Sequence, residues 1–141
     1  MTTPHENITP LSGPVLLSQG CLDALHHLKE KRDVNTALLR LEDDVLAAEA
    51  EANWTHDELL QALPAAEPRL VVHELSFATP TGTRRHEPLL ILWMPPPAGT
   101  REEAYTAAYT TLQEALTEVR VHLTARHRDQ LAYLRLVHLA D

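Results

Sequence analysis

Histidine, cysteine and paired carboxylates are the side chains through which this chain could bind a metal or carry out acid–base chemistry. There are nine histidines among 141 residues, enough to raise a metal site as a hypothesis. His26 and His27 are adjacent on an expected helix, so their side chains point about 100° apart and do not chelate one ion. His73 and His122 fall on expected strands, and no His-x-x-x-His pair with a supporting carboxylate is present. We therefore expect structural or solvent-exposed histidines, no bound metal and no cofactor.

The single cysteine and the paired acids have equally ordinary explanations. Cys21 is near the start of an expected helix, where the pKa of a thiol could fall, but it also lies on an apolar stripe and is expected to be buried. Asp43 and Asp44 occupy a turn, while Glu102 and Glu103 begin a helix, where acids stabilise the helix dipole. The chain has no G-x-G-x-x-G, Walker, G-x-S-x-G or C-x-x-C motif. We predict a protein that is not an enzyme and has no catalytic residues.

The elements that must position any functional side chain are organised around residues 63–95. Leu70–Phe77 is dense in apolar residues, and Leu89–Met94 is apolar throughout, with Pro88 and Pro95 as its limits. The second run is too short for a capped helix, and its unbroken apolar character is typical of a strand buried on both faces. The polar connection contains proline and glycine, which favours an antiparallel hairpin with a long loop. These two strands are expected at the centre of a sheet.

Capping signals and helical spacing predict helices before and after these strands. Ser18 has the position of an N-cap, and Lys29, Lys31 and Arg32 place cations at the negative end of the same helix. Two capping boxes begin further helices, Thr55 with Glu58 and Thr100 with Glu103. The residues expected on apolar faces are Cys21, Leu22, Leu25 and Leu28 in the first helix; Tyr105, Ala108, Leu112, Ala115, Leu116 and Val119 in the longest; and Leu131, Leu134 and Val137 in a closing helix from about His127.

Further strands are indicated on both sides of the central pair. Val34–Leu41 and Val45–Glu51 predict a second hairpin, in which Leu46, Ala48 and Ala50 share one face. Alternation of apolar and polar residues over 119–124 predicts one more strand, at an edge or half-buried.

The resulting order is helix, two strands, helix, two strands, helix, strand, helix. It favours an α/β (α+β) sandwich: a central mixed, mainly antiparallel sheet of about five strands, flanked by helices on both faces. Residues 1–13 are polar and are interpreted as a flexible N-terminal arm, followed by a single domain over residues 14–141.

Charge and hydropathy exclude several classes of function. The net charge is −8 with neutral histidines, which disfavours a nucleic-acid binder because phosphate contacts require a dense cationic face. No apolar run approaches 18 residues, so no transmembrane segment is expected. The first residues lack a basic region followed by an apolar core, and one cysteine cannot form an internal disulfide. We expect a cytoplasmic protein.

Three stretches together resemble the actin-depolymerising-factor homology (ADF-H) domain, over roughly Gly13–Val137. The stretch from Ser18 to Lys29 is similar to the first helix of that family. Trp93-Met94-Pro95 resembles the Trp-x-Pro that ends its central strand, and Thr100–Thr117 occupies the position of its long actin-binding helix. The resemblance implies the gelsolin-like ADF-H fold.

Within this family, the pattern is most similar to glia maturation factor. Leu63-Pro64 followed by Pro68-Arg69 and three apolar residues matches one of its motifs. Pro88-Leu89 matches the opening of its next strand, and residues 35–41 are similar to its first strand. Cofilin, which shares Trp-x-Pro, is the next most similar member.

The resemblance implies a monomeric binding module of the actin cytoskeleton. Glia maturation factors bind the branch-nucleating actin-related-protein complex, dissociate filament branches and inhibit nucleation, whereas cofilins bind actin and sever or depolymerise filaments. One family surface, combining the arm and the long helix, corresponds here to Ser12, Gly13, Ser18, Arg101, Glu102, Ala104, Tyr105 and Tyr109. The second, combining the loop between the central strands with the last helix, corresponds to Arg84, Arg85, Arg126, Arg128 and Arg135.

The sequence departs from the cofilin pattern at the start of the long helix. Cofilin has lysines and a methionine there, whereas Arg101-Glu102-Glu103-Ala104 stands here. Actin-type partners present acidic surfaces, so anions at this position reduce long-range attraction. This difference favours a glia-maturation-like role, with cofilin-type severing as the alternative. Since a fold does not determine a function, an enzyme or small-ligand domain that merely shares the fold is a third possibility.

Overall fold

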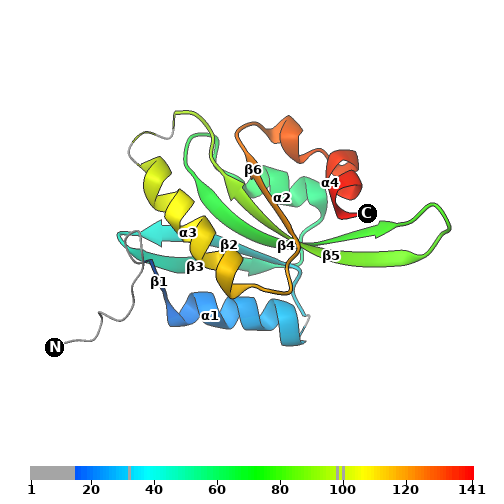
Figure 1. The fold of residues 1–141 in the computed structure, drawn as a ribbon, viewed down its shortest axis with the longest axis horizontal. Helices are drawn as coiled ribbons and strands as arrows, with labels where there is room; N and C mark the ends of the chain where they lie inside the picture. Colours follow the sequence, from blue (N-terminus) through cyan, green and yellow to red (C-terminus); the bar gives the residue numbers. More distant parts are fainter. Residues whose placement is uncertain (1–14, 32, 98, 100) are drawn as a thin grey trace.

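The computed structural model describes residues 15–31, 33–97, 99 and 101–141. At its centre is the expected antiparallel hairpin, formed by β4 (Arg69–Ala78) and β5 (Arg84–Trp93). The hairpin projects beyond the rest of the sheet as a two-stranded ribbon (Figure 1). Its first part contains Pro88, which the sequence had suggested as the limit of the strand; that limit was wrong. The next strand pairs with β5 only from Leu89 onward, so Pro88 lies where β5 has one neighbour and a missing N–H is tolerated.

The hairpin belongs to a six-stranded mixed sheet with the order β1-β3-β2-β4-β5-β6. β2 (Thr36–Glu42) and β3 (Val45–Ala52) form the second expected hairpin, and β6 (Val121–Ala125) is an edge strand parallel to β5. The sixth strand, β1 (Leu16–Leu17), pairs in parallel with β3 and was not expected. Two residues are too few to show a periodicity of two, so no sequence pattern could reveal it.

A bulge in β3 changes which residues share a face. Leu38 is opposite Ala50 while Leu39 is opposite Ala48, so Glu49 has no partner in the ladder. An extra residue reverses the alternation beyond it. Ala48 therefore packs in one core cluster and Ala50 in the other, and the expectation that both lie on one face was wrong.

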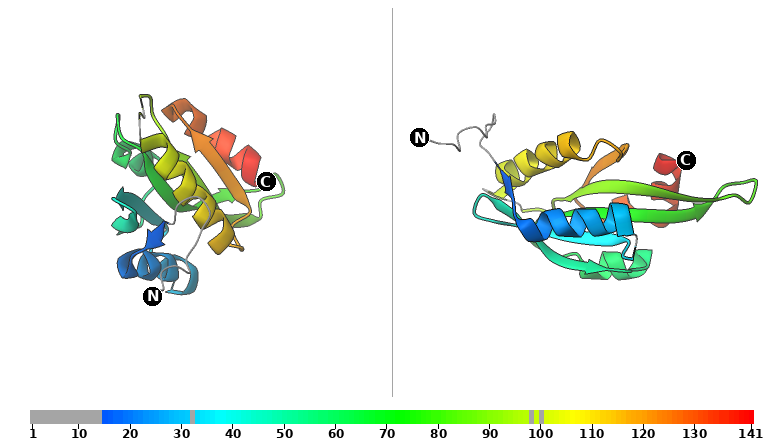
Figure 2. Two further views of the ribbon diagram at one scale, coloured as in Figure 1. Left: turned by 60° about the vertical axis from the view of Figure 1, so that its left-hand side comes forward. Right: turned by 90° about the horizontal axis from the view of Figure 1, so that it is seen from below.

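Helices cover both faces of the sheet, as expected (Figure 2). α1 (Gln19–His26) and α3 (Arg101–Ala115) bury Cys21, Ala24 and Tyr105 in the core on one face. α2 (His56–Ala62) and α4 (Tyr133–Ala140) bury their apolar residues in the core on the other face. No helix in the described part of the chain is both long and apolar enough to cross a membrane.

The expected helix caps at Ser18 and Thr55 are present, but the limits of the helices differ from those that the sequence predicts. The Ser18 hydroxyl accepts a hydrogen bond from the Cys21 amide at 3.0 Å, and Thr55 with Glu58 forms a capping box. Thr100 lies outside the described residues. α1 continues as a π-helical segment, η2 (His27–Lys31), rather than as one α-helix.

Two of the expected apolar stripes contain an exposed leucine. Leu22 on α1 is 44% exposed, and Ala24 takes its place in the core. The closing helix is divided into a 3₁₀ turn, η3 (Arg128–Leu131), and α4, with Ala132 between them. This break shifts the helical phase, which leaves Leu134 78% exposed instead of buried.

Candidate functional site

The start of α3 is fixed to the sheet by Tyr105. Its side chain is fully buried, and its hydroxyl accepts a hydrogen bond from the Leu41 amide of β2 at 2.9 Å. The Arg101 guanidinium lies over the Tyr105 ring at 5.4 Å and donates to the Leu41 carbonyl at 3.4 Å. Tyr105 was carried over as a partner-binding residue, but it offers no surface to a partner. Its role is to position α3.

The exposed face of α3 begins with Glu102, Glu103 and Ala104. Tyr109, about one turn further on, is half-buried, and burial raises the pKa of its phenol. Glu102 forms an ion pair with Arg126 at 3.0 Å. The outer face of α3 is therefore mostly small or polar, and its first turn carries two acids, of which one is compensated.

Ser18 lies at the same end of the sheet as the start of α3. The Ser18 amide donates to the Leu46 carbonyl of β3, and Leu46 is the ladder partner of Leu41, to which Tyr105 and Arg101 are bonded. The structure thus brings Ser18 and the start of α3 together around the β2–β3 turn. We refer to Ser18 with Glu102, Glu103, Ala104 and Tyr109 as the α3 surface. Ser12 and Gly13, assigned to it from the sequence, lie outside the described residues.

Arg84, Arg85 and Arg135 lie at the opposite end. Arg84 is paired with Ala78 next to the hairpin tip, whereas Trp93 at the other end of β5 pairs with Arg69. Arg85 is held in place: it forms ion pairs with Glu87 at 3.3 Å and Asp141 at 3.0 Å, and lies over the Phe77 ring.

Arg84 and Arg135 are exposed, and neither forms an ion pair within the described part of the chain. We refer to Arg84, Arg135 and the exposed leucines of α4 as the hairpin surface. The leucines, Leu134 and Leu139, are 78% and 44% exposed. Sequence reasoning missed Leu134 because it lies three residues after Leu131 and therefore shares its phase on an unbroken helix; the break at Ala132, which exposes Leu134, has no signal in the sequence.

The structure separates Arg126 and Arg128 from the hairpin surface. Both follow the end of β6, whose last residue Ala125 pairs with Trp93, at the end of the sheet where α3 begins. Arg128 donates to the carbonyls of Leu60 and Leu63, and its guanidinium lies over the Trp93 ring at 5.4 Å. Arg128 therefore supports the end of α2.

The histidines singled out from the sequence do not converge. His73 is 3% exposed and its Nδ1 lies 2.7 Å from the Thr36 hydroxyl; burial, and to a lesser degree the charge of His56, lower its pKa to about 4. His122 is exposed and faces the side of the sheet that α3 covers, because the neighbouring Val121 and Leu123 pack on the opposite face. Within the described residues, no group of three histidine, cysteine or acidic side chains could hold a metal ion. Cys21 is fully buried, which raises the pKa of its thiol to about 11.

The described residues thus form a mixed sheet between two helical layers, with exposed surfaces at both ends of the sheet. The chain belongs to the cofilin/ADF family: residues 14–137 match the family described as cofilin/tropomyosin-type actin-binding protein.

Known proteins of the same family are similar in sequence and in fold. An actophorin of Entamoeba histolytica is 32% identical over 88 residues, a match that covers 62% of this chain and 63% of the actophorin. A cofilin of Mycosarcoma maydis is 20% identical over 127 residues, covering 87% and 91% of the two chains. The crystal structure of Streptomyces griseoflavus cofilin superposes with a TM-score of 0.80 at 22% identity, covering 90% of this chain and 99% of that one. Glia maturation factor, expected from the sequence as the most similar member, is not among these relatives.

Proposed function

We propose that this protein binds actin through the α3 surface and contacts a second subunit of the filament through the hairpin surface. One observation carries the proposal: the two surfaces lie at opposite ends of β5. A partner bound at one end leaves the other end accessible. Membership of an actin-binding family supports the choice of partner.

The residue types on the two surfaces agree with this assignment. Ala104 on the α3 surface is small, so a partner can approach the helix backbone closely. The hairpin surface combines the cations Arg84 and Arg135 with Leu134, a mixture that suits a partner with acidic and apolar patches.

Co-sedimentation with actin filaments, together with a binding assay for monomeric actin, tests the proposal. We expect Ala104→Glu to weaken both activities. The double variant Arg84→Ala/Arg135→Ala should weaken filament binding while leaving monomer binding unchanged. Gln61→Glu, at an exposed position of α2 on the opposite face, adds the same charge as Ala104→Glu and is the matched control. Equal loss of both activities in the double variant would contradict two separate surfaces, and a wild-type chain that binds neither form of actin would overturn the proposal.

A second candidate function is the glia-maturation-like one, in which the chain binds the branch-nucleating actin-related-protein complex and dissociates filament branches. The observation that favours it is the acidic first turn of α3, Glu102 and Glu103, where the cofilin pattern has cations. Branch lifetimes on filaments assembled with the purified complex separate the two functions. Shorter branch lifetimes without saturable pelleting on unbranched filaments would favour the second candidate. Saturable pelleting in the micromolar range would favour the first.

A further inference from the structure

The outer part of the β4–β5 hairpin pairs with no other strand. β2 pairs with β4 only as far as His73, and β6 pairs with β5 only from Leu89 onward. In the sheet, residues 74–78 and 84–88 therefore pair only with one another, and we refer to them as the ribbon (Figure 1). An isolated two-stranded hairpin is marginally stable in water, so the direction of the ribbon depends on what packs against its two faces.

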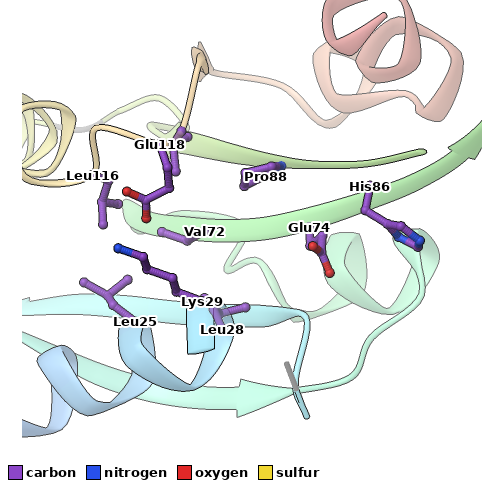
Figure 3. Close-up of a pocket in the computed structure, with 10 residues that line it drawn as sticks. Leu25, Leu28, Lys29, Val72, Glu74, His86, Pro88, Leu116 and Glu118 are labelled. Carbon is purple, nitrogen blue, oxygen red and sulfur yellow. The ribbon is translucent and has the colours of Figure 1, made fainter. Parts of the chain in front are cut away.

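One face of the ribbon borders a cavity. Glu74, His86 and Pro88 line a space of about 240 Å³ (Figure 3). Leu28 of η2 and Leu116, which follows α3, line the other side of the same space. Side chains at a cavity lack part of the atomic contacts that close packing provides. The opposite face must therefore supply most of the support for the ribbon.

The opposite face of the ribbon packs on α4. Leu75 and Phe77 of the ribbon are both 1% exposed. They belong to the same apolar cluster as Leu136 and Ala140 of α4. Burial of apolar surface is non-directional, so it holds the ribbon and α4 together without fixing how the two are aligned. Their alignment requires directional contacts.

Directional contacts join the ribbon to both ends of α4. The hydroxyl of Tyr133, the first residue of α4, donates a hydrogen bond to the Ser76 carbonyl of β4 at 2.9 Å. At the other end of α4, the Arg85 guanidinium of β5 forms an ion pair with Asp141 at 3.0 Å. The same guanidinium donates to the Ala140 carbonyl at 3.4 Å. Each strand of the ribbon is thus bonded to a different end of the helix, which fixes both the position and the direction of the ribbon on α4.

The two side chains that make these contacts are themselves held in place. The ring of Tyr133 lies edge-on to the ring of His56 on α2, with the centroids 5.7 Å apart. The Arg85 guanidinium lies 5.4 Å from the centroid of the Phe77 ring. It also forms an ion pair at 3.3 Å with Glu87, which is 5% exposed, and a buried carboxylate requires cationic partners. Both donors are therefore oriented before any partner binds.

We propose that Arg85 and Tyr133 are positioning residues for partner binding at the hairpin surface, because they hold Arg84 on the ribbon and Arg135 on α4 in one relative geometry. This inference rests on the proposed function. The hairpin surface takes its residues from two elements, and a partner that contacts both binds more tightly when the two are aligned in advance. Without the two contacts, the ribbon and α4 remain packed, but a partner has to order them as it binds.

Amide hydrogen exchange in the free protein tests the alignment without actin. We expect Tyr133→Phe and Asp141→Asn each to raise the exchange rates of the ribbon amides by about threefold, while the amides of β2 and β3 keep their wild-type rates. Asp23→Asn, at an exposed position of α1, makes the same charge change as Asp141→Asn and is the matched control. Wild-type exchange in the ribbon of both Tyr133→Phe and Asp141→Asn, or an equal increase in Asp23→Asn, would overturn the proposal.

Filament co-sedimentation of the same variants separates positioning from direct contact. If Arg85 acts by positioning, Asp141→Asn should weaken filament binding about threefold and leave binding of monomeric actin unchanged. A direct contact between Arg85 and an acidic partner predicts the opposite sign, because the variant frees the guanidinium and removes a negative charge. Unchanged or stronger filament binding by Asp141→Asn would therefore overturn the positioning role. Failure of the proposed function is distinct, since the wild-type chain would then bind neither form of actin.

Discussion

The carboxylate of Glu102 and the guanidinium of Arg126 lie 3.0 Å apart and join the start of α3 to the end of β6. Sequence analysis had placed these residues on two different surfaces. The side chains are 48% and 45% exposed, so the pair contributes only about 0–1 kcal/mol to stability. Its effect is on the charge of the α3 surface, because Arg126 compensates Glu102, while Glu103 forms no ion pair within the described residues.

Glu103 is therefore the acid whose reversal should strengthen binding to an acidic partner. We expect Glu103→Lys to raise affinity for actin filaments by up to about fivefold, because a rim charge contributes roughly 0–1 kcal/mol. The gain should decrease at high salt. Co-sedimentation at two ionic strengths measures it. Glu114→Lys makes the same charge change near the other end of α3, and an equal gain in that variant would assign the effect to net charge.

Arg69 should be among the charged residues most important for stability. Its side chain is 5% exposed and donates to Glu49 at 2.7 Å and to the Pro68 carbonyl at 2.8 Å. Arg69→Met leaves the Glu49 carboxylate without this partner, and because Glu49 is 34% exposed, we expect a loss of about 2–3 kcal/mol in the free energy of unfolding. Urea denaturation measures the change. The exposed Arg40 on β2 is the control, and Arg40→Met should change stability by less than about 0.5 kcal/mol.

Arg128 and Arg135 should respond differently to truncation, although both were assigned to the same surface from the sequence. Arg128→Ala removes hydrogen bonds to Leu60 and Leu63 and the contact with Trp93, so it should cost about 1–2 kcal/mol in stability. Arg135→Ala should leave the melting temperature unchanged and weaken filament binding. The result that would contradict this division is an Arg128→Ala protein of wild-type stability that no longer pellets with filaments.

Local chemistry explains which parts of the fold could be predicted from the sequence. The caps at Ser18 and Thr55 depend on side chains within three residues of one another, and the buried run in β5 has a composition that few other elements share. The bulge at Glu49 could not be predicted, because an alanine-rich strand has no pattern strong enough to show a change of register.

The candidate site was predictable in part for the same reason. The exposed turn at Glu102 and Glu103 and the cationic pair at the hairpin are local features of the sequence. The contacts that remove Arg126 and Arg128 from the hairpin surface join residues 24 to 68 positions apart, so only the folded chain could reveal them.

His73 makes the stability of this protein dependent on pH below neutrality. Burial lowers its pKa to about 4 from the ordinary histidine value of 6.5, so between these pH values the unfolded chain binds a proton that the folded chain does not. Stability is therefore greatest above pH 6.5 and falls as the pH is lowered toward 4, by up to about 3 kcal/mol from this residue.

His73→Phe should reduce this decline in stability at low pH. The Thr36 hydroxyl then keeps only its hydrogen bond to Asn35, so the variant loses some stability at neutral pH. Urea denaturation at pH 7.5, 6, 5 and 4.5 measures the slope, and His138→Phe, at an exposed position on α4, is the matched control. An unchanged slope in His73→Phe, or an equal reduction in His138→Phe, would show that other groups cause the acid sensitivity.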